Sequence, residues 1–243
     1  MQHNWLERTE LLLQKKGIKK LQNSHVLVVG LGGVGSFATE FLTRAGIGSL
    51  TIVDGDAVDI TNINRQLPAT TATVGEFKAD VVAKRLLEIN PQLKLTVIKK
   101  FLSPQEAFDI VDAKYDYVLD CIDSLQPKIQ LLIACKRKKV KVVSAMGAGG
   151  KSDPSKVLVR DISKTRDCTL ARVVKKELKK NKIHKGIRCV FSTEIQDKNS
   201  VFVTDGSDYK RSFYGTISYM PALFGLYASA EVIRKIVSRT SNS

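Results

Sequence analysis

The sequence predicts an α/β fold in which helices cover both faces of a doubly wound, mainly parallel sheet. Short β-branched apolar runs alternate with helical apolar patterns about every 25 residues, as in such a sheet. The first run, Val26 to Val29, is bounded by glycine and has no polar face, which is typical of a strand buried on both sides. The 243 residues suffice for one good core, so we expect a single domain over residues 1–243.

The segment before this strand, residues 1–24, is expected to be helical. Its leucines and Ile18 are separated by lysines, which favours one or two short amphipathic helices. Gly17 is expected to break or cap the first of them.

The loop after the first strand carries glycines at the spacing G-x-G-x-x-G, at Gly30, Gly32 and Gly35. Such glycines allow a tight turn, close approach of the backbone to a phosphate and close packing of the next helix. We expect the additional Gly33 to keep the loop clear for the nucleotide. Asp54 ends the next apolar run, where a carboxylate can accept ribose hydroxyls. Together these features predict a nucleotide site in a Rossmann-like sheet.

Helical and strand patterns continue to the end of the chain. Ser103 has the position of a helix N-cap. Residues 196–214 are rich in Asp, Lys and Ser and are expected to form a mobile loop. The further expected helices cover residues 74–90, 104–111, 125–136, 169–182 and 216–237, and the further strands 93–98, 115–120, 140–145, 156–161, 187–191 and 200–203.

Composition restricts the class of protein. With 39 Lys and Arg against 24 Asp and Glu, the net charge is +15, which favours a polyanionic partner; solvated lysine-rich faces are the alternative. The four cysteines are widely spaced, which argues against a zinc site or a disulfide scaffold and fits reduced thiols in the cytoplasm. The longest late apolar stretch, residues 220–230, is shorter than the roughly 20 residues of a membrane span, so no membrane association is expected.

Further polar groups after the glycine loop indicate which nucleotide is bound. Each alone has an ordinary alternative, such as a surface charge, a turn former or a helix cap. Together they supply carboxylates for ribose and Mg²⁺ and two cations for a triphosphate, which nucleotidyl transfer needs and hydride transfer does not. The groups are Asp54 with Asp56, the run Asn62, Asn64, Arg65 and Gln66, the lysine Lys78, and Asp123 with Ser124.

These motifs closely resemble the ubiquitin-activating-enzyme-like superfamily over roughly residues 8–150. The resemblance implies that Asp54 holds ribose, that Asn62, Arg65 and Lys78 bind phosphates of ATP, and that Asp123 coordinates Mg²⁺. The motifs that carry it are 30–35 (GLGGVG), 53–56 (VDGD), 61–66 (TNINRQ), 74–78 (VGEFK) and 120–123 (DCID).

Three further segments resemble one branch, the tRNA threonylcarbamoyladenosine dehydratases: residues 8–12 (RTELL), 147–150 (GAGG) with 153–154 (DP), and 189–194 (CVFSTE). The resemblance implies that a tRNA carrying threonylcarbamoyladenosine is adenylated on its carboxylate and then closes a ring. The alternative is an adenylyltransferase that activates the C-terminus of a sulfur-carrier or ubiquitin-like protein.

The resemblance also leads to hypotheses about partners. Lys175, Lys176, Lys179 and Lys180 on the basic helix are candidates for RNA binding. A homodimer is expected, in which Arg8 reaches the ATP of the partner subunit. A sulfur-relay protein is a further candidate partner. Cys189 is either a reactive thiol or a small buried apolar residue.

Overall fold

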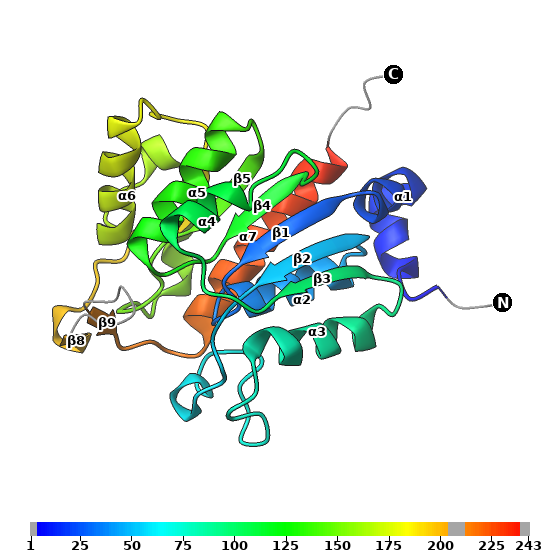
Figure 1. The fold of residues 1–243 in the computed structure, drawn as a ribbon, viewed down its shortest axis with the longest axis horizontal. Helices are drawn as coiled ribbons and strands as arrows, with labels where there is room; N and C mark the ends of the chain where they lie inside the picture. The colour runs from blue at the N-terminus through cyan, green and yellow to red at the C-terminus, as the bar shows by residue number, and fades with distance from the viewer. Residues whose placement is uncertain (1–3, 204–211, 239–243) are drawn as a thin grey trace.

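The computed structural model describes residues 4–203 and 212–238 and confirms the predicted fold class. The main sheet has seven strands in the order β3-β2-β1-β4-β5-β7-β6, of which β6 alone runs antiparallel to its neighbour (Figure 1). The strands are β1 (His25–Val29), β2 (Ser49–Val53), β3 (Lys94–Ile98), β4 (Tyr117–Asp120), β5 (Lys141–Ala145), β6 (Val157–Asp161) and β7 (Arg188–Ser192).

Helices cover both faces of this sheet. On one face α2, α3 and α7 form a core with side chains such as Leu42, Leu86 and Phe224. On the other face α4, α5 and α6 form a second core, and successive residues of β1 alternate between the two, with Val28 in the first and Leu27 in the second. The helices are α2 (Gly35–Arg44), α3 (Lys78–Ile89), α4 (Pro104–Asp109), α5 (Leu125–Arg137), α6 (Thr169–Lys180) and α7 (Tyr219–Val237).

The N-terminal segment is helical as predicted, but the expectation for Gly17 is wrong. One element, α1 (Glu7–Gln22), runs through Gly17, and its kink lies at Gln14, where φ is 62°. Gly17 is buried, and a Cβ there would lie 3.5 Å from Cγ1 of Val237 at the end of α7. A Cβ there would also lie 2.9 Å from Cβ of Leu13, on the other side of the kink, so Gly17 belongs to the kinked helix and does not end it.

Other departures are local. The α3 helix begins at Lys78, four residues later than predicted, because Phe77 instead bridges Ala57 as an isolated antiparallel pair. The predicted N-cap Ser103 is confirmed by a capping box with Glu106.

The segment expected to be a mobile loop contains regular structure in its described part. The strands β8 (Val201–Val203) and β9 (Ser212–Tyr214) pair as a small antiparallel sheet, whereas residues 204–211 lie outside the described residues. Within residues 4–203 and 212–238, no helix combines the length and apolar character needed to cross a membrane.

Candidate active site

The sequence-predicted site residues follow the carboxyl ends of β1, β2 and β4, which are neighbours in the sheet. We call this end of the sheet, with the loops after β1, β2, β4 and β5, the site edge. The loop that follows β2 and the start of α7 lie together at this edge, while α1 lies at the other end of the sheet (Figure 1). Parallel strands bring their carboxyl ends together, and ligands of such sheets bind there.

The glycine loop needs its glycines for contacts within the protein. Gly30 has a φ of +91°, and a Cβ there would lie 2.7 Å from the carbonyl oxygen of Cys121. A Cβ on Gly35 would overlap the carbonyl oxygen of Gly30. The loop is thus pressed between β4 and its own helix, and α2 begins directly behind it.

Gly33, which was expected to keep the loop clear for the nucleotide, is also required by a contact within the protein. A Cβ there would lie 2.8 Å from Cβ of Pro221 and 3.1 Å from the carbonyl oxygen of Arg65. A side chain at Gly33 would therefore collide first with the start of α7, whether or not a nucleotide is present.

Asp54 fixes the glycine loop to the end of β2. Its carboxylate accepts hydrogen bonds from the backbone N–H of Leu31 at 2.6 Å and of Asp56 at 2.8 Å. Burial raises the pKa of Asp54 despite these two hydrogen bonds. Each oxygen of an ionised carboxylate has two acceptor positions, so Asp54 can still accept further donors such as hydroxyl groups.

Lys78 is not a free cation in this structure. Its ammonium is almost buried and lies 2.8 Å from the carboxylate of Asp56. The backbone N–H of Lys78 also donates to the carbonyl of Asp56 at 3.0 Å. The two residues, 22 positions apart, therefore form one unit at the start of α3.

The run from Asn62 to Gln66 is ordered by its own side chains. The buried Asn62 accepts from the backbone N–H of Asp59 at 3.2 Å. Arg65 donates to the carbonyl of Thr61 at 2.9 Å and to the side chain of Asn64 at 2.8 Å. Asn64 in turn donates to the carbonyl of Thr216 at 2.9 Å, which joins this loop to the segment before α7.

Arg65 lies within electrostatic reach of Asp123. Burial lowers the pKa of the Arg65 guanidinium, and the negative charge of Asp123 opposes that shift. Asp123 is exposed just beyond β4, and Ser124 is the N-cap residue of α5 without a capping hydrogen bond from its side chain. The structure thus brings a cation from the loop after β2 to a carboxylate after β4.

Gln66 offers an acceptor that the described residues leave unused. Its Oε1 is buried and has no hydrogen-bond partner among them. Its side chain lies beside Gly32, where a Cβ would be 3.7 Å from Nε2. A buried polar atom without a partner costs free energy, so a bound group with a donor would be stabilised here.

The donor set fits MgATP. Among the described residues no cluster of three or more His, Cys, Asp or Glu side chains can hold a metal alone. Mg²⁺ is usually held by one or two carboxylates together with substrate phosphates and water, and Asp56 and Asp123 can supply those carboxylates. The cations Lys78 and Arg65 lie near the same two acids, where phosphates would need them.

A buried ionic cluster under the site edge was missed by sequence reasoning. Lys128 Nζ lies 2.5 Å from the carboxylate of Asp120 and 3.0 Å from the carbonyl of Ala145, and both charged side chains have no exposed surface. Ser144 donates to the same carboxylate at 2.5 Å. Asp120 also accepts from the backbone N–H of Ile122 at 3.1 Å. The only sequence signal was a lysine inside the apolar pattern of α5.

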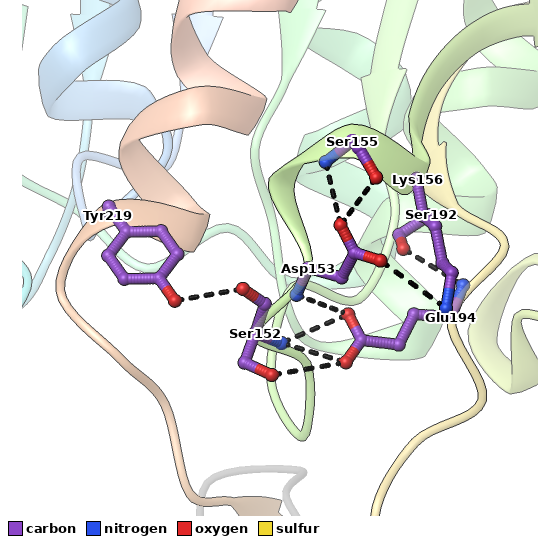
Figure 2. Close-up of polar contacts among 7 residues, drawn as sticks. All are labelled: Ser152, Asp153, Ser155, Lys156, Ser192, Glu194 and Tyr219. Atoms are coloured by element: carbon purple, nitrogen blue, oxygen red, sulfur yellow. Dashed lines mark hydrogen bonds and ion pairs between the residues drawn. The ribbon is translucent and has the colours of Figure 1, made fainter.

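The loop after β5 is held by Glu194. Its carboxylate accepts from the backbone N–H groups of Ser152 at 3.0 Å and Asp153 at 2.8 Å, as Figure 2 shows. These bonds and the hydroxyl of Ser152 lower the pKa of Glu194 against the effect of its burial. The hydroxyl of Tyr219, at the start of α7, donates to the carbonyl of Ser152 at 2.8 Å.

The structure does not bring Arg8 or Cys189 to these residues. Arg8 is exposed on α1, at the far end of the sheet (Figure 1). Cys189 lies on β7 beside Ser144 with no exposed surface, and burial raises its pKa. The reactive-thiol hypothesis therefore has no geometric support, and Cys189 packs as a small core residue.

The four candidate RNA-binding lysines on α6 differ in their contacts. Lys175 donates to the carbonyl of Thr165 at 2.8 Å, and Lys180 pairs with Glu177 at 2.8 Å. Lys176 and Lys179 are exposed and have no ion pair among the described residues. Of the four, these two have no such partner among the described residues, so they reach a phosphate without giving up a contact within the protein.

Comparison with known proteins agrees with this geometry. The ThiF family profile matches residues 6–243. The tRNA threonylcarbamoyladenosine dehydratase of Bacillus subtilis is 43% identical over 237 residues, which cover 95% of this chain and 93% of that protein. The crystal structure of the Escherichia coli tRNA N6-threonylcarbamoyladenosine dehydratase in complex with ATP superimposes with a TM-score of 0.85 at 36% identity, covering 95% of this chain and 93% of that one.

Relatives that activate sulfur carriers match a smaller part of the chain. The sulfur carrier protein ThiS adenylyltransferase of E. coli is 37% identical over 136 residues, which cover 55% of this chain and 54% of that protein. The bacterial dehydratases are matched over nearly their whole length, from 90% to 96% of each protein, which confirms the resemblance found in the motifs. The chain therefore belongs to the ThiF family, and within it to the group of the tRNA threonylcarbamoyladenosine dehydratases.

Proposed function

We propose that this protein is an ATP-dependent dehydratase that cyclises threonylcarbamoyladenosine in the anticodon loop of tRNA. The carboxylate of the threonylcarbamoyl group attacks the α-phosphate of ATP and releases pyrophosphate. A nucleophilic atom of the same group then attacks the acyl adenylate, loses its proton and expels AMP. The net change in the RNA is the loss of one water. The observation that carries this proposal is the near full-length match to enzymes of that name, with Lys78, Arg65, Asp56 and Asp123 gathered at one edge of the sheet.

Each site residue has a proposed role that its surroundings support. Asp54, fixed between the glycine loop and β2, accepts the ribose hydroxyls. The loop with glycines 30, 32, 33 and 35 surrounds the phosphates, and Gly30 shapes its turn while its own N–H donates to the carbonyl of Val53 at 2.8 Å. The residues Asn62, Asn64, Gln66 and Ser124 complete the lining of the nucleotide site. Gln66 contributes the unpartnered buried acceptor.

Arg65 and Lys78 stabilise the charge that develops on the phosphates, and Asp123 with Asp56 would hold Mg²⁺. The Lys78–Asp56 pair suits this task, because its carboxylate has an affinity for Mg²⁺ and its ammonium has one for phosphate. Mg²⁺ held there would supply positive charge next to the phosphates. No protein nucleophile is required, which agrees with the burial of Cys189.

We further propose a homodimer in which Arg8 reaches the ATP of the partner subunit. Leu11 and Leu12 follow Arg8 by three and four positions, so the three lie on one face of α1. The leucines are 75% and 80% exposed, so in an isolated chain they contribute little hydrophobic stabilisation. An exposed apolar face next to a cation fits a second copy of this chain.

The tRNA is proposed to contact Lys176 and Lys179 on α6, with Lys175 and Lys180 contributing less because they have partners within the protein. We place the activity in the cytoplasm, where tRNA is modified. A sulfur-relay protein remains a proposed partner, but it would not transfer sulfur to Cys189, whose thiol is enclosed in the core.

ATP labelled at the α-phosphate tests the function. The protein is incubated with tRNA carrying threonylcarbamoyladenosine, with the same tRNA lacking the modification, or with a sulfur-carrier protein. We expect AMP and pyrophosphate only with the modified tRNA, together with loss of the mass of one water from the RNA. AMP release stimulated by the carrier protein instead would favour the alternative adenylyltransferase, and absence of turnover with the modified tRNA would refute the proposal.

A further inference from the structure

The segment from Tyr214 to Pro221, which we call the crossing segment, contacts three loops of the site edge. Its Gly215 accepts from the backbone N–H of Gly150 at 2.8 Å, after β5. Its Thr216 accepts from Asn64, after β2. Its Pro221 abuts Gly33, after β1. Residues of this segment therefore lie beside three of the loops that form the site edge.

Tyr219 of this segment is held in place by a hydrogen bond and still has an exposed ring. Its hydroxyl donates to the carbonyl of Ser152 at 2.8 Å, and Ser152 is itself held by Glu194 (Figure 2). Even so, 42% of Tyr219 is exposed, and Ile217, two positions earlier, is 45% exposed. A ring anchored at both ends loses little entropy when something packs on its face, which suits it to binding.

We propose that the ring of Tyr219 stacks on a nucleobase of the RNA loop that brings its carboxylate to ATP. Single-stranded RNA loops are recognised mainly by stacking of their bases on aromatic side chains. The net charge of +15 attracts a polyanion such as RNA. This inference rests on the proposed function and adds a substrate-contacting residue to it.

The order of the strands separates the expected position of this RNA base from that of the ATP ribose. The proposed ribose ligand Asp54 follows β2, whereas Ser152 belongs to the loop after β5. In the sheet, β1 and β4 lie between those two strands, so their ends are about 14 Å apart at the usual strand spacing. An exposed ring on the β2 side is Phe101, which is 66% exposed and would touch a Cβ on Gly55. Phe101 is therefore the matched control.

The test measures binding of a modified anticodon stem–loop and of ATP by the full-length variants. Stacking is worth about 1–3 kcal/mol per base, so Tyr219→Leu should raise the RNA Kd and KM about 5- to 150-fold. Its ATP affinity should be unchanged. Tyr219→Phe, which keeps the ring and removes the bond to Ser152, should stay near wild type, as should Phe101→Leu.

A direct readout uses the fact that Trp5 is the only tryptophan. In Trp5→Phe/Tyr219→Trp, RNA should quench the fluorescence and ATP alone should not. Wild-type RNA affinity of Tyr219→Leu would overturn the inference while leaving the proposed function intact. An equal loss in Tyr219→Phe and Tyr219→Leu would assign Tyr219 a purely structural role, and a loss in Phe101→Leu alone would move the contact to the β2 side. A wild-type protein that does not use the modified RNA would overturn the proposed function and this inference together.

Discussion

Replacing Lys128 by methionine should be the most destabilising single change near the site. Methionine keeps most of the aliphatic length but leaves the carboxylate of Asp120 buried without a cation. The ammonium makes two described hydrogen bonds, to Asp120 and to the carbonyl of Ala145. At about 1.5–3 kcal/mol for each charged hydrogen bond, the loss is about 3–6 kcal/mol, which agrees with the roughly 3–5 kcal/mol found when one partner of a buried ion pair is removed.

A loss of about 4 kcal/mol corresponds to a fall in Tm of about 8–16 °C for a domain of this size. Urea unfolding and calorimetry measure it. The matched control is Asp120→Asn/Lys128→Met, in which the carboxamide can still bond Ser144 and the N–H of Ile122. The double variant should be more stable than Lys128→Met alone by roughly 1–3 kcal/mol. A loss below about 1 kcal/mol in Lys128→Met, or a double variant as unstable as the sum of the two single ones, would refute the reasoning.

Four more outcomes are expected. Cys189→Ala should retain AMP formation per folded molecule, because the thiol is enclosed; loss of turnover with an unchanged Tm would contradict this. Lys176→Gln/Lys179→Gln should lower the salt slope of tRNA binding by about 2, and Lys175→Gln/Lys180→Gln by less; equal slopes would refute the distinction. Burial raises the pKa of Asp54, so its carboxylate becomes protonated at a higher pH than an ordinary aspartate, and ATP affinity should begin to fall at that higher pH. If Asp54→Asn shows the same pH profile of ATP affinity, titration of Asp54 is not the cause. Leu11→Glu/Leu12→Glu should yield monomers in analytical ultracentrifugation while Leu87→Glu does not; a wild-type monomer would refute the dimer.

Local patterns predicted most of the fold because each βα unit is specified nearby in the sequence. The run Val26 to Val29 reads as apolar throughout because its residues alternate between two cores. The Ser103 cap was equally readable, since its partner Glu106 is three residues away. The glycine motif and Asp54 belong to this class of signal, and their contact is confirmed by the 2.6 Å bond to Leu31.

Features that depend on distant contacts were not predictable in this way. The pairing of Lys78 with Asp56 was missed because Lys78 in isolation resembles a free phosphate ligand. The burial of Lys128 follows from β4 and β5 meeting above α5, which no local pattern specifies. Tyr219 was missed because its importance comes from a bond to Ser152, 67 residues earlier.

The strand order has a consequence for the protein while it is being synthesised. The strand β1 pairs with β2 on one side but with β4 on the other, and β4 begins 64 residues after β2 ends, at Tyr117 against Val53. At about 5–20 residues per second, the ribosome leaves one edge of β1 open for about 3–13 s. The sheet face covered by α7 stays exposed for longer, because that helix is the last element of the described chain. The α7 helix also packs on α1, where Lys20 donates to the carbonyl of Val237. Closure of the domain thus joins its first helix to its last, and a nascent chain released before α7 emerges would expose the apolar side chains around Leu42 and Val28.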